Sequence, residues 1–200
     1  MKIFATIISL TSAQGVCQWQ WAKSGDRLKC LPNFYIDGMC ESGRRDDCGW
    51  AKEKFALYIL KFRGVGTSRS FGIRCCPSSR SIPIGEFQNC EWQGGGTGVN
   101  VECPVNGAGR MQLAVGRCST SARNDNNGAC QQDEVHSAFC CDTQSKVDDV
   151  YCGWLYETYG KNLICPTGLV ATGFCGVNNK ADCNQGKKFA GIKCCPVKAL

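Results

Sequence analysis

The chain has 200 residues, 18 of them cysteine, and a formal charge of +6. This cysteine content is typical of disulfide scaffolds from oxidising compartments, and a single His136 with no Cys-x-x-Cys pair argues against a thiolate zinc centre. Lysine and arginine are scattered among acids, and Arg44-Arg45 is followed directly by Asp46-Asp47, so the sequence offers no nucleic-acid-binding stripe.

Residues 1–15 have the pattern of a signal peptide. A basic residue precedes an apolar stretch over residues 3–10, and small residues, Ala13 and Gly15, stand where signal peptidase requires them. We expect a secreted, extracellular protein whose mature chain starts near Val16. The alternative is a first strand that belongs to the fold, because the apolar stretch is short. No other segment is apolar and long enough to span a bilayer.

The cysteines divide the chain into three copies of one unit. Their successive separations are 13, 10, 8, 27 and 1 in the first, 13, 15, 12, 10 and 1 in the second, and 13, 10, 8, 11 and 1 in the third. We therefore expect three cysteine-rich repeats, over residues 16–80, 88–143 and 150–198. Three further residues keep the same phase: the tryptophan two after the first cysteine (Trp19, Trp92, Trp154), the glycine eight after it (Gly25, Gly98, Gly160), and the glycine two before the third cysteine (Gly38, Gly116, Gly173).

Differences in length between the repeats locate the loops. The first repeat carries about sixteen extra residues within Gly49–Ser70, and the second carries five extra within Pro104–Val115. Insertions lie on exposed loops because a core strand could not absorb them. A function that differs between the repeats is therefore expected at these two inserts.

The pattern of short apolar runs predicts an all-β fold. Helical periodicity is almost absent, and only Trp50–Phe62 could form a helix, or else an elaborated hairpin. Runs such as Leu169–Ala171 and Gly191–Cys195 are bounded by turn-forming residues, which is typical of strands. Since side chains alternate along a strand, one sulfur of each Cys-Cys pair should point into the core and the other elsewhere.

Each repeat is too small to bury a sufficient core alone. We expect the three repeats to share one pseudo-threefold core, β-prism-like or trefoil-like, stabilised by disulfides at about 2 to 4 kcal/mol each. Short linkers, Pro77–Asn89 and Asp142–Tyr151, favour contact between repeats. Independent units remain the alternative, because each repeat has its own even set of cysteines.

The third repeat carries Cys152-Gly-Trp154, then Cys165-Pro-Thr-Gly-Leu-Val-Ala-Thr-Gly173-Phe, and closes on Cys194-Cys195. This pattern resembles the repeat of dermatopontin, an extracellular matrix protein family with invertebrate members that agglutinate cells. The skeleton matches in all three repeats, but Phe71-Gly-Ile-Arg and its counterparts replace the Asp-Arg-x-Trp of dermatopontin. The Gly-Ile-Arg strand resembles, more weakly, the vitelline membrane outer layer protein I family, a threefold β-prism.

The resemblance to dermatopontin implies that first and fifth, second and sixth, and third and fourth cysteines pair. From the sequence alone, six cysteines in a unit allow many other pairings. The implied bonds are Cys17–Cys75, Cys30–Cys76, Cys40–Cys48, Cys90–Cys140, Cys103–Cys141, Cys118–Cys130, Cys152–Cys194, Cys165–Cys195 and Cys175–Cys183.

No enzyme, metal or cofactor is predicted. His136 has no nucleophile beside it in a motif, and all cysteines can be paired. Neighbouring carboxylates could hydrolyse a glycoside, and Asp/Asn-rich loops could bind calcium, but both are usually solvated turn residues. The carboxylate pairs are Asp46-Asp47, Asp133-Glu134 and Asp148-Asp149, and the loops are 46–47, 124–127 and 178–182.

Aromatic residues are the expected ligand-binding groups. The repeated tryptophans would stack on sugars if exposed, whereas an indole near a disulfide often packs in the core. Trp21, Trp50, Tyr156 and Tyr159 lack counterparts in all repeats, so they are better candidates for a surface that one ligand uses.

These features together predict a secreted, disulfide-stabilised extracellular matrix, coat or adhesion protein. Its expected partners are extracellular glycans, in a lectin-like manner, or matrix proteins, and it could self-assemble. Several similar weak sites would give avidity. The alternative is a secreted defence effector, a protease inhibitor or toxin that uses the loop Gly49–Ser70. The chain contains no Asn-x-Ser/Thr acceptor and no Arg-Gly-Asp tripeptide.

Overall fold

The computed structural model describes residues 16–23, 25–41, 70–79, 82–96, 98–107, 109–119, 130, 136–176, 183 and 190–198. Within these residues the fold is all-β, with one turn of 3-10 helix, η2 (Asp149–Tyr151). No helix in this part of the chain is long and apolar enough to cross a membrane. The expected leader, 1–15, and the segment Trp50–Phe62 lie outside the described residues.

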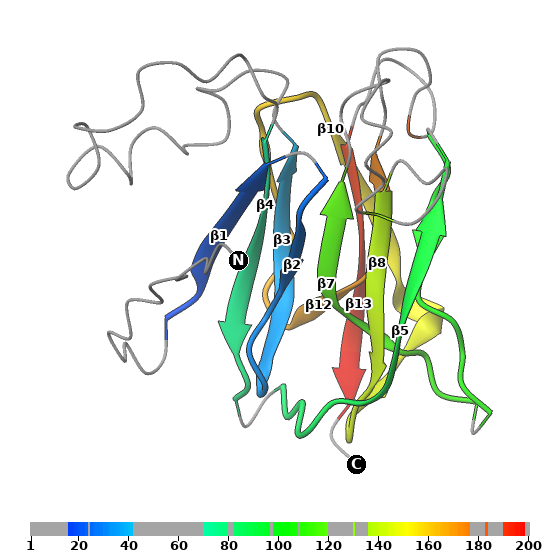
Figure 1. The fold of residues 1–200 in the computed structure, drawn as a ribbon. Coiled ribbons are helices and arrows are strands. Elements are labelled where there is room, and N and C mark those ends of the chain that lie inside the picture. Colours follow the sequence, from blue (N-terminus) through cyan, green and yellow to red (C-terminus); the bar gives the residue numbers. More distant parts are fainter. Residues whose placement is uncertain are drawn as a thin grey trace, which may run out of the picture.

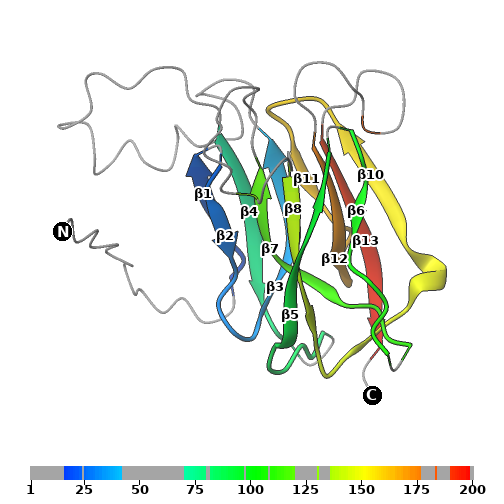
Figure 2. The same cartoon turned by 45° about the vertical axis from the view of Figure 1, so that its right-hand side comes forward.

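The strands form three antiparallel sheets whose long strands have roughly aligned axes (Figures 1 and 2). In spatial order, the first sheet contains β1 (Gln18–Lys23), β4 (Ser70–Pro77), β3 (Phe34–Glu41) and β11 (Asn162–Ile164). The second contains β2 (Arg27–Lys29), β7 (Leu113–Ser119), β8 (His136–Asp142) and β5 (Gln88–Gly95). The third contains β10 (Gly153–Glu157), β13 (Ala190–Lys198), β12 (Leu169–Gly176) and β6 (Val101–Glu102), and β9 (Lys146–Val147) pairs with the end of β13.

Each sheet takes one edge strand from a different repeat. β2 of the first repeat pairs with β7 of the second, and β6 of the second pairs with β12 of the third. β11 of the third repeat then pairs with β3 of the first. The three exchanges close a cycle, so the sheet of each repeat is completed by another repeat.

The inner faces of the sheets pack on one another. One cluster of buried side chains takes members from all three sheets, among them Ile36 and Ile73, Ala138, and Phe174 and Ile192. The three sheets therefore share a hydrophobic core, and the repeats are not independent units.

The glycine two residues before the third cysteine lies where the exchanged strand docks. A register shift occurs at this glycine in all three sheets. A Cβ added to Gly116 would lie 2.7 Å from the carbonyl oxygen of Leu28 on β2. A Cβ added to Gly173 would lie 2.6 Å from the carbonyl oxygen of Val101 on β6. A side chain here would push the neighbouring repeat's strand away, because the obstacle is backbone.

The glycine eight residues after the first cysteine makes a second contact between repeats. Its positive φ, 88° at Gly25 and 79° at Gly160, suits a residue without a side chain. Its backbone N–H donates a hydrogen bond to the carbonyl oxygen of the last residue of a strand from another repeat. The pairs are Gly25 with Ser119, Gly98 with Gly176, and Gly160 with Glu41.

The disulfide connectivity differs from the one that the dermatopontin resemblance implies. The first cysteine of each repeat pairs with the sixth, and the second pairs with the fifth. The expected bonds Cys17–Cys75, Cys30–Cys76, Cys90–Cys140, Cys103–Cys141, Cys152–Cys194 and Cys165–Cys195 are therefore wrong. The observed bonds are Cys17–Cys76, Cys30–Cys75, Cys90–Cys141, Cys103–Cys140, Cys152–Cys195 and Cys165–Cys194.

The remaining expected bonds join the third and fourth cysteines. Cys118–Cys130 and Cys175–Cys183 are present. Cys40 is disulfide-bonded, but its expected partner Cys48 lies outside the described residues.

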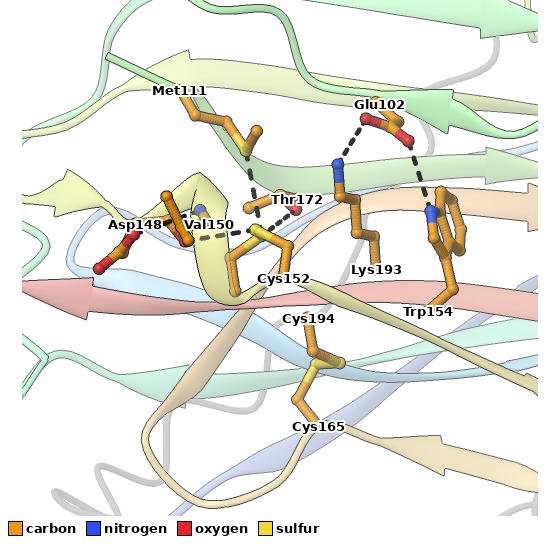
Figure 3. Close-up of a disulfide and its surroundings, with 11 residues drawn as sticks. Glu102, Met111, Asp148, Val150, Cys152, Trp154, Cys165, Thr172, Lys193 and Cys194 are labelled. Atoms are coloured by element: carbon orange, nitrogen blue, oxygen red, sulfur yellow. Dashed lines mark hydrogen bonds and ion pairs between the residues drawn. A yellow bond between two sulfur atoms is a disulfide. The ribbon is translucent and has the colours of Figure 1, made fainter.

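Strand register explains the correction. Gln18 lies opposite Cys75, so Cys17, one residue earlier, faces Cys76 on the outer side of the sheet. Cys75 points to the inner side of the sheet, where it is bonded to Cys30, the residue that follows β2 in the chain. Both cysteines belong to the core cluster. The expected alternation of the two sulfurs is confirmed, and Figure 3 shows the two bonds of the third repeat on either side of β13.

Candidate functional site

The outer side of every sheet carries the same cross-strand row of four residues. The row runs from the repeated tryptophan to the residue before the Cys-Cys pair, then to the bulge glycine, and ends on the residue before the second cysteine of another repeat. We call the surfaces around these rows the first, second and third outer faces. The rows are Trp19, Arg74, Gly38 and Ile164; Trp92, Phe139, Gly116 and Lys29; and Trp154, Lys193, Gly173 and Glu102.

Alternation along the strands points these rows away from the core. On the exchanged strands, Val101 and Leu163 belong to the core cluster, whereas the next residues, Glu102 and Ile164, are exposed. The repeated tryptophans are half-buried on the outer faces, so they are not part of the shared core.

The first outer face presents two stacked indoles. The rings of Trp19 and Trp21 have centroids 5.2 Å apart and planes inclined by 13°. Trp21 lies over Gly72, in the space that a Cβ at that glycine would occupy. Arg74 pairs with Asp37 at 3.5 Å, and burial raises the pKa of Asp37 while Arg74 opposes that rise.

The third outer face combines stacked aromatics with fixed polar groups. The rings of Trp154 and Tyr156 have centroids 5.6 Å apart and are inclined by 10°. The Glu102 carboxylate accepts hydrogen bonds from the Trp154 indole at 3.3 Å and the Lys193 ammonium at 2.5 Å (Figure 3). Asn100 donates its amide to the Tyr156 hydroxyl oxygen at 3.1 Å. Rings and hydrogen-bonding groups therefore share one surface.

The second outer face is aromatic and basic. Trp92 and Phe139 lie 4.9 Å apart between ring centroids. The guanidinium of Arg27 lies 5.0 Å from the Trp92 ring centroid, and the ammonium of Lys29 lies 3.4 Å from that of Phe139.

No model of a known protein family matches the chain, and no curated protein matches its sequence. The resemblance to dermatopontin therefore stays a prediction.

The structure distributes the expected ligand-binding residues over two faces. Trp21 lies on the first face, stacked on Trp19. Tyr156 and Tyr159 come together near Trp154, where all three pack against the Cys175–Cys183 disulfide. Trp50 lies outside the described residues.

Sequence reasoning missed the charged members of the faces, Glu102 and Lys193 on the third face and Arg27 and Lys29 on the second. Their position relative to the cysteines was visible, since Lys29 and Glu102 each precede a second cysteine. That signal could be used only with knowledge that this residue is delivered to another repeat's sheet.

A buried polar cluster lies on the inner side of the sheets. The Glu41 carboxylate accepts hydrogen bonds from Arg117 and Ser119, and the guanidinium packs between the rings of Phe71 and Phe174. These contacts compensate a charge that would be costly to bury alone.

His136 lies in the same interior region. Its Nε2 donates to the carbonyl oxygen of Val99 at 2.8 Å. Burial, and then the charge of Arg117, lower the pKa of His136 to about 4. The imidazole is fully buried and neutral, which suits a structural residue of the interior.

Of the acidic pairs named from the sequence, only Asp148-Asp149 lies within the described residues. Asp148 accepts a hydrogen bond from the N–H of Val150 at the start of η2 and pairs with Lys198, so it has a structural role, while Asp149 is exposed. The other acidic pairs and all the Asp/Asn-rich loops lie outside the described residues. Within them, Cys17, Asp37 and Cys76 have the spacing of a metal site, but both sulfurs belong to one disulfide.

The insert of the second repeat contributes one residue to the lining of a cavity. Val105 and Met111 form a β-bridge, and Asn106 donates to Asp142 at 2.8 Å. Arg110 of this insert borders a cavity of about 510 Å³, together with Pro83, Glu86, Gln88 and residues 143–145.

Proposed function

We propose that this chain is a secreted, disulfide-stabilised protein of the extracellular matrix, a coat or an adhesive layer, which attaches by binding glycans on its outer faces. Its three repeats form a pseudo-threefold, β-prism-like body. This proposal extends the expected likeness to dermatopontin-type matrix proteins and assigns no chemical reaction to the chain.

The observation that carries the proposal is the pair of stacked aromatic sets at equivalent places on two sheets. Trp19 with Trp21, and Trp154 with Tyr156, each cover a glycine on the neighbouring strand. Half-buried rings held on a sheet offer flat apolar surfaces that suit the CH faces of sugars. On the third face, Glu102 and Lys193 lie at the edge of the rings, where sugar hydroxyls would need hydrogen-bond partners.

The disulfides support an extracellular setting. Eight bonds join described cysteines, and such a density is typical of proteins that fold in an oxidising compartment. Binding faces on three different sheets would allow one molecule to engage several glycan chains, which gives avidity and favours cross-linking or self-assembly.

A glycan array and a haemagglutination assay with the full chain test the proposal. We expect binding to neutral glycans, weakened by Trp19→Ala and by Trp154→Ala by roughly fivefold each, since an aromatic contact contributes about 1 kcal/mol. Tyr151→Ala is the control, because Tyr151 is 73% exposed in η2 and lies outside the rows.

A protease panel should be run beside the glycan assays. Nanomolar inhibition of a protease without any glycan signal would favour the defence-effector alternative, whose expected reactive loop lies outside the described residues. Glycan binding that is unchanged in both tryptophan variants would remove the first and third outer faces as the site.

A further inference from the structure

The second outer face differs from the other two in the position and the neighbours of the cation in its row. Lys29 occupies the position that Glu102 holds on the third face and Ile164 holds on the first. Phe139 stands where both other faces carry a cation. The cation of the second row therefore lies on the exchanged strand, beside two aromatic rings.

Two cations of this face are held over two rings. Arg27 and Lys29 are two residues apart on β2, so they project to the same side about 7 Å apart along the strand. Arg27 lies over Trp92, and Lys29 lies 3.4 Å from the Phe139 ring centroid and 5.5 Å from that of Trp92. The rings orient both charges and keep part of the surrounding water away.

The cations of the other faces have carboxylate partners within the face. Lys193 pairs with Glu102, and Arg74 pairs with Asp37. Within the part of the chain that the structure describes, no ion pair involves Lys29. The ammonium of Lys29 is therefore available to an external anion.

The ionisation of Lys29 reflects the same arrangement. Partial burial lowers the pKa of Lys29, and the neighbouring charge of Arg27 lowers it further. An anion placed between the two groups would relieve their repulsion and favour the charged ammonium.

We propose that the outer face of the β2–β7–β8–β5 sheet binds a sulfated glycan, with Lys29 and Arg27 contacting sulfate groups above the floor formed by Trp92 and Phe139. This inference rests on the proposed function and names a ligand class for one of its three faces. The first and third faces keep their neutral-glycan preference, because their cations are paired within the face.

Charge distribution favours this occupant over a nucleic acid or a membrane. Lysine and arginine are otherwise scattered among acids along the chain, with no long basic stripe for a phosphate backbone. A two-cation site beside aromatic rings matches single sulfate groups on a sugar chain better than a broad anionic lipid surface, which needs clusters of basic residues.

The test measures binding of the full chain to heparin as a probe, by calorimetry at low and at physiological salt. We expect binding that weakens with salt, and a roughly tenfold loss in Lys29→Gln, because a charge-assisted contact is removed. Lys29→Arg should retain binding. Lys161→Gln is the matched control, since Lys161 is exposed outside the second face and the change in net charge is the same.

A second measurement needs no variant. Lysine acylation of the native protein, read by mass spectrometry, should show Lys29 protected by bound heparin and Lys161 unprotected. Misfolding of the Lys29→Gln variant would leave this result intact.

Three outcomes in the binding and protection experiments would overturn the inference, and a fourth comes from comparison with neutral glycans. The three are equal losses in the Lys29→Gln and Lys161→Gln variants, heparin binding without protection of Lys29, and Lys29-dependent binding to phosphatidylserine vesicles that exceeds binding to heparin. Neutral-glycan binding without any heparin binding would also defeat it while leaving the proposed function standing. If the native chain bound no glycan at all, neutral or sulfated, the proposed function itself would be defeated.

Discussion

The residue after the bulge glycine is Met39, Arg117 or Phe174, and all three are fully buried. Arg117 brings a charge to a position that is apolar in the other repeats. Glu41 compensates it, although Nε and Nη1 of Arg117 have no hydrogen-bond partner among the described residues. Removing Glu41 alone would therefore leave an uncompensated charge in the interior, which is strongly destabilising.

His136 makes stability depend on pH. Its pKa is about 4 in the folded chain and near 6.5 when exposed, so between these values the unfolded chain binds the extra proton. The stabilisation is complete above about pH 6.5 and decreases as the pH falls, by about 2 to 3 kcal/mol at about pH 4.5. His136→Phe, which copies Phe71 at the equivalent position, should flatten this dependence.

Urea unfolding of the native chain and of the His136→Phe variant, with intact disulfides, at neutral pH and at about pH 4.5, measures this pH dependence of stability. Carboxylates contribute to the pH dependence of both proteins, so the difference between them isolates His136. Equal losses of stability on acidification in the two proteins would show that His136 does not carry the effect.

At the scale of the elements, the edge strands that come from another repeat, β2, β6 and β11, are held by both hydrogen bonds and disulfides. The backbone N–H of Cys30 donates a hydrogen bond to the carbonyl oxygen of Val115 in the second sheet. The sulfur of Cys30 forms a disulfide with Cys75 in the first sheet. Cys103 and Cys165 make the same pair of contacts in their sheets. Each second–fifth disulfide therefore ties a strand of one sheet to a strand of the next.

Docking of β6 on β12 should fail when Gly173 gains a side chain. The added Cβ would meet the backbone of Val101 at 2.6 Å and that of Glu102 at 3.2 Å, neither of which can rotate away. We expect Gly173→Ala to lower the free energy of unfolding by about 1 to 3 kcal/mol, measured by denaturant unfolding. Gly153→Ala is the control, because nothing lies within 4 Å of its Cβ, and its effect should stay within about 0.5 kcal/mol. Equal effects would mean that strand docking tolerates a side chain.

For the molecule as a whole, the cyclic exchange makes the three repeats interdependent. A chain that ends after residue 147 lacks β11 and β12, so β3 loses its edge partner and β6 loses its sheet. We expect this two-repeat chain to give no cooperative thermal transition after oxidative refolding, whereas the full chain does. Calorimetry makes the comparison, and a sharp transition in the two-repeat chain would restore the picture of independent units.

The fold was predictable where the sequence repeats a local requirement. Short apolar runs bounded by turn-forming residues predicted strands, and adjacent cysteines predicted two sulfurs on opposite sides of a strand. The phase of Gly38, Gly116 and Gly173 marked a special place, although its role in strand docking was visible only in three dimensions. For the candidate site, Trp21, Tyr156 and Tyr159 were named from the sequence, whereas Glu102 and Lys29 were missed because they reach their faces on strands of another repeat.

By itself, the sequence determined the three-repeat cysteine frame, the all-β class and the chain positions of the repeated tryptophans, because each depends on spacing within a short segment. Only the tertiary structure decided which cysteines pair, which repeat completes which sheet, and which charges join each tryptophan. These depend on register between strands far apart in the chain, and a shift of one residue moves every side chain to the opposite face. That one-residue difference separates Cys17–Cys75, as expected, from Cys17–Cys76, as observed.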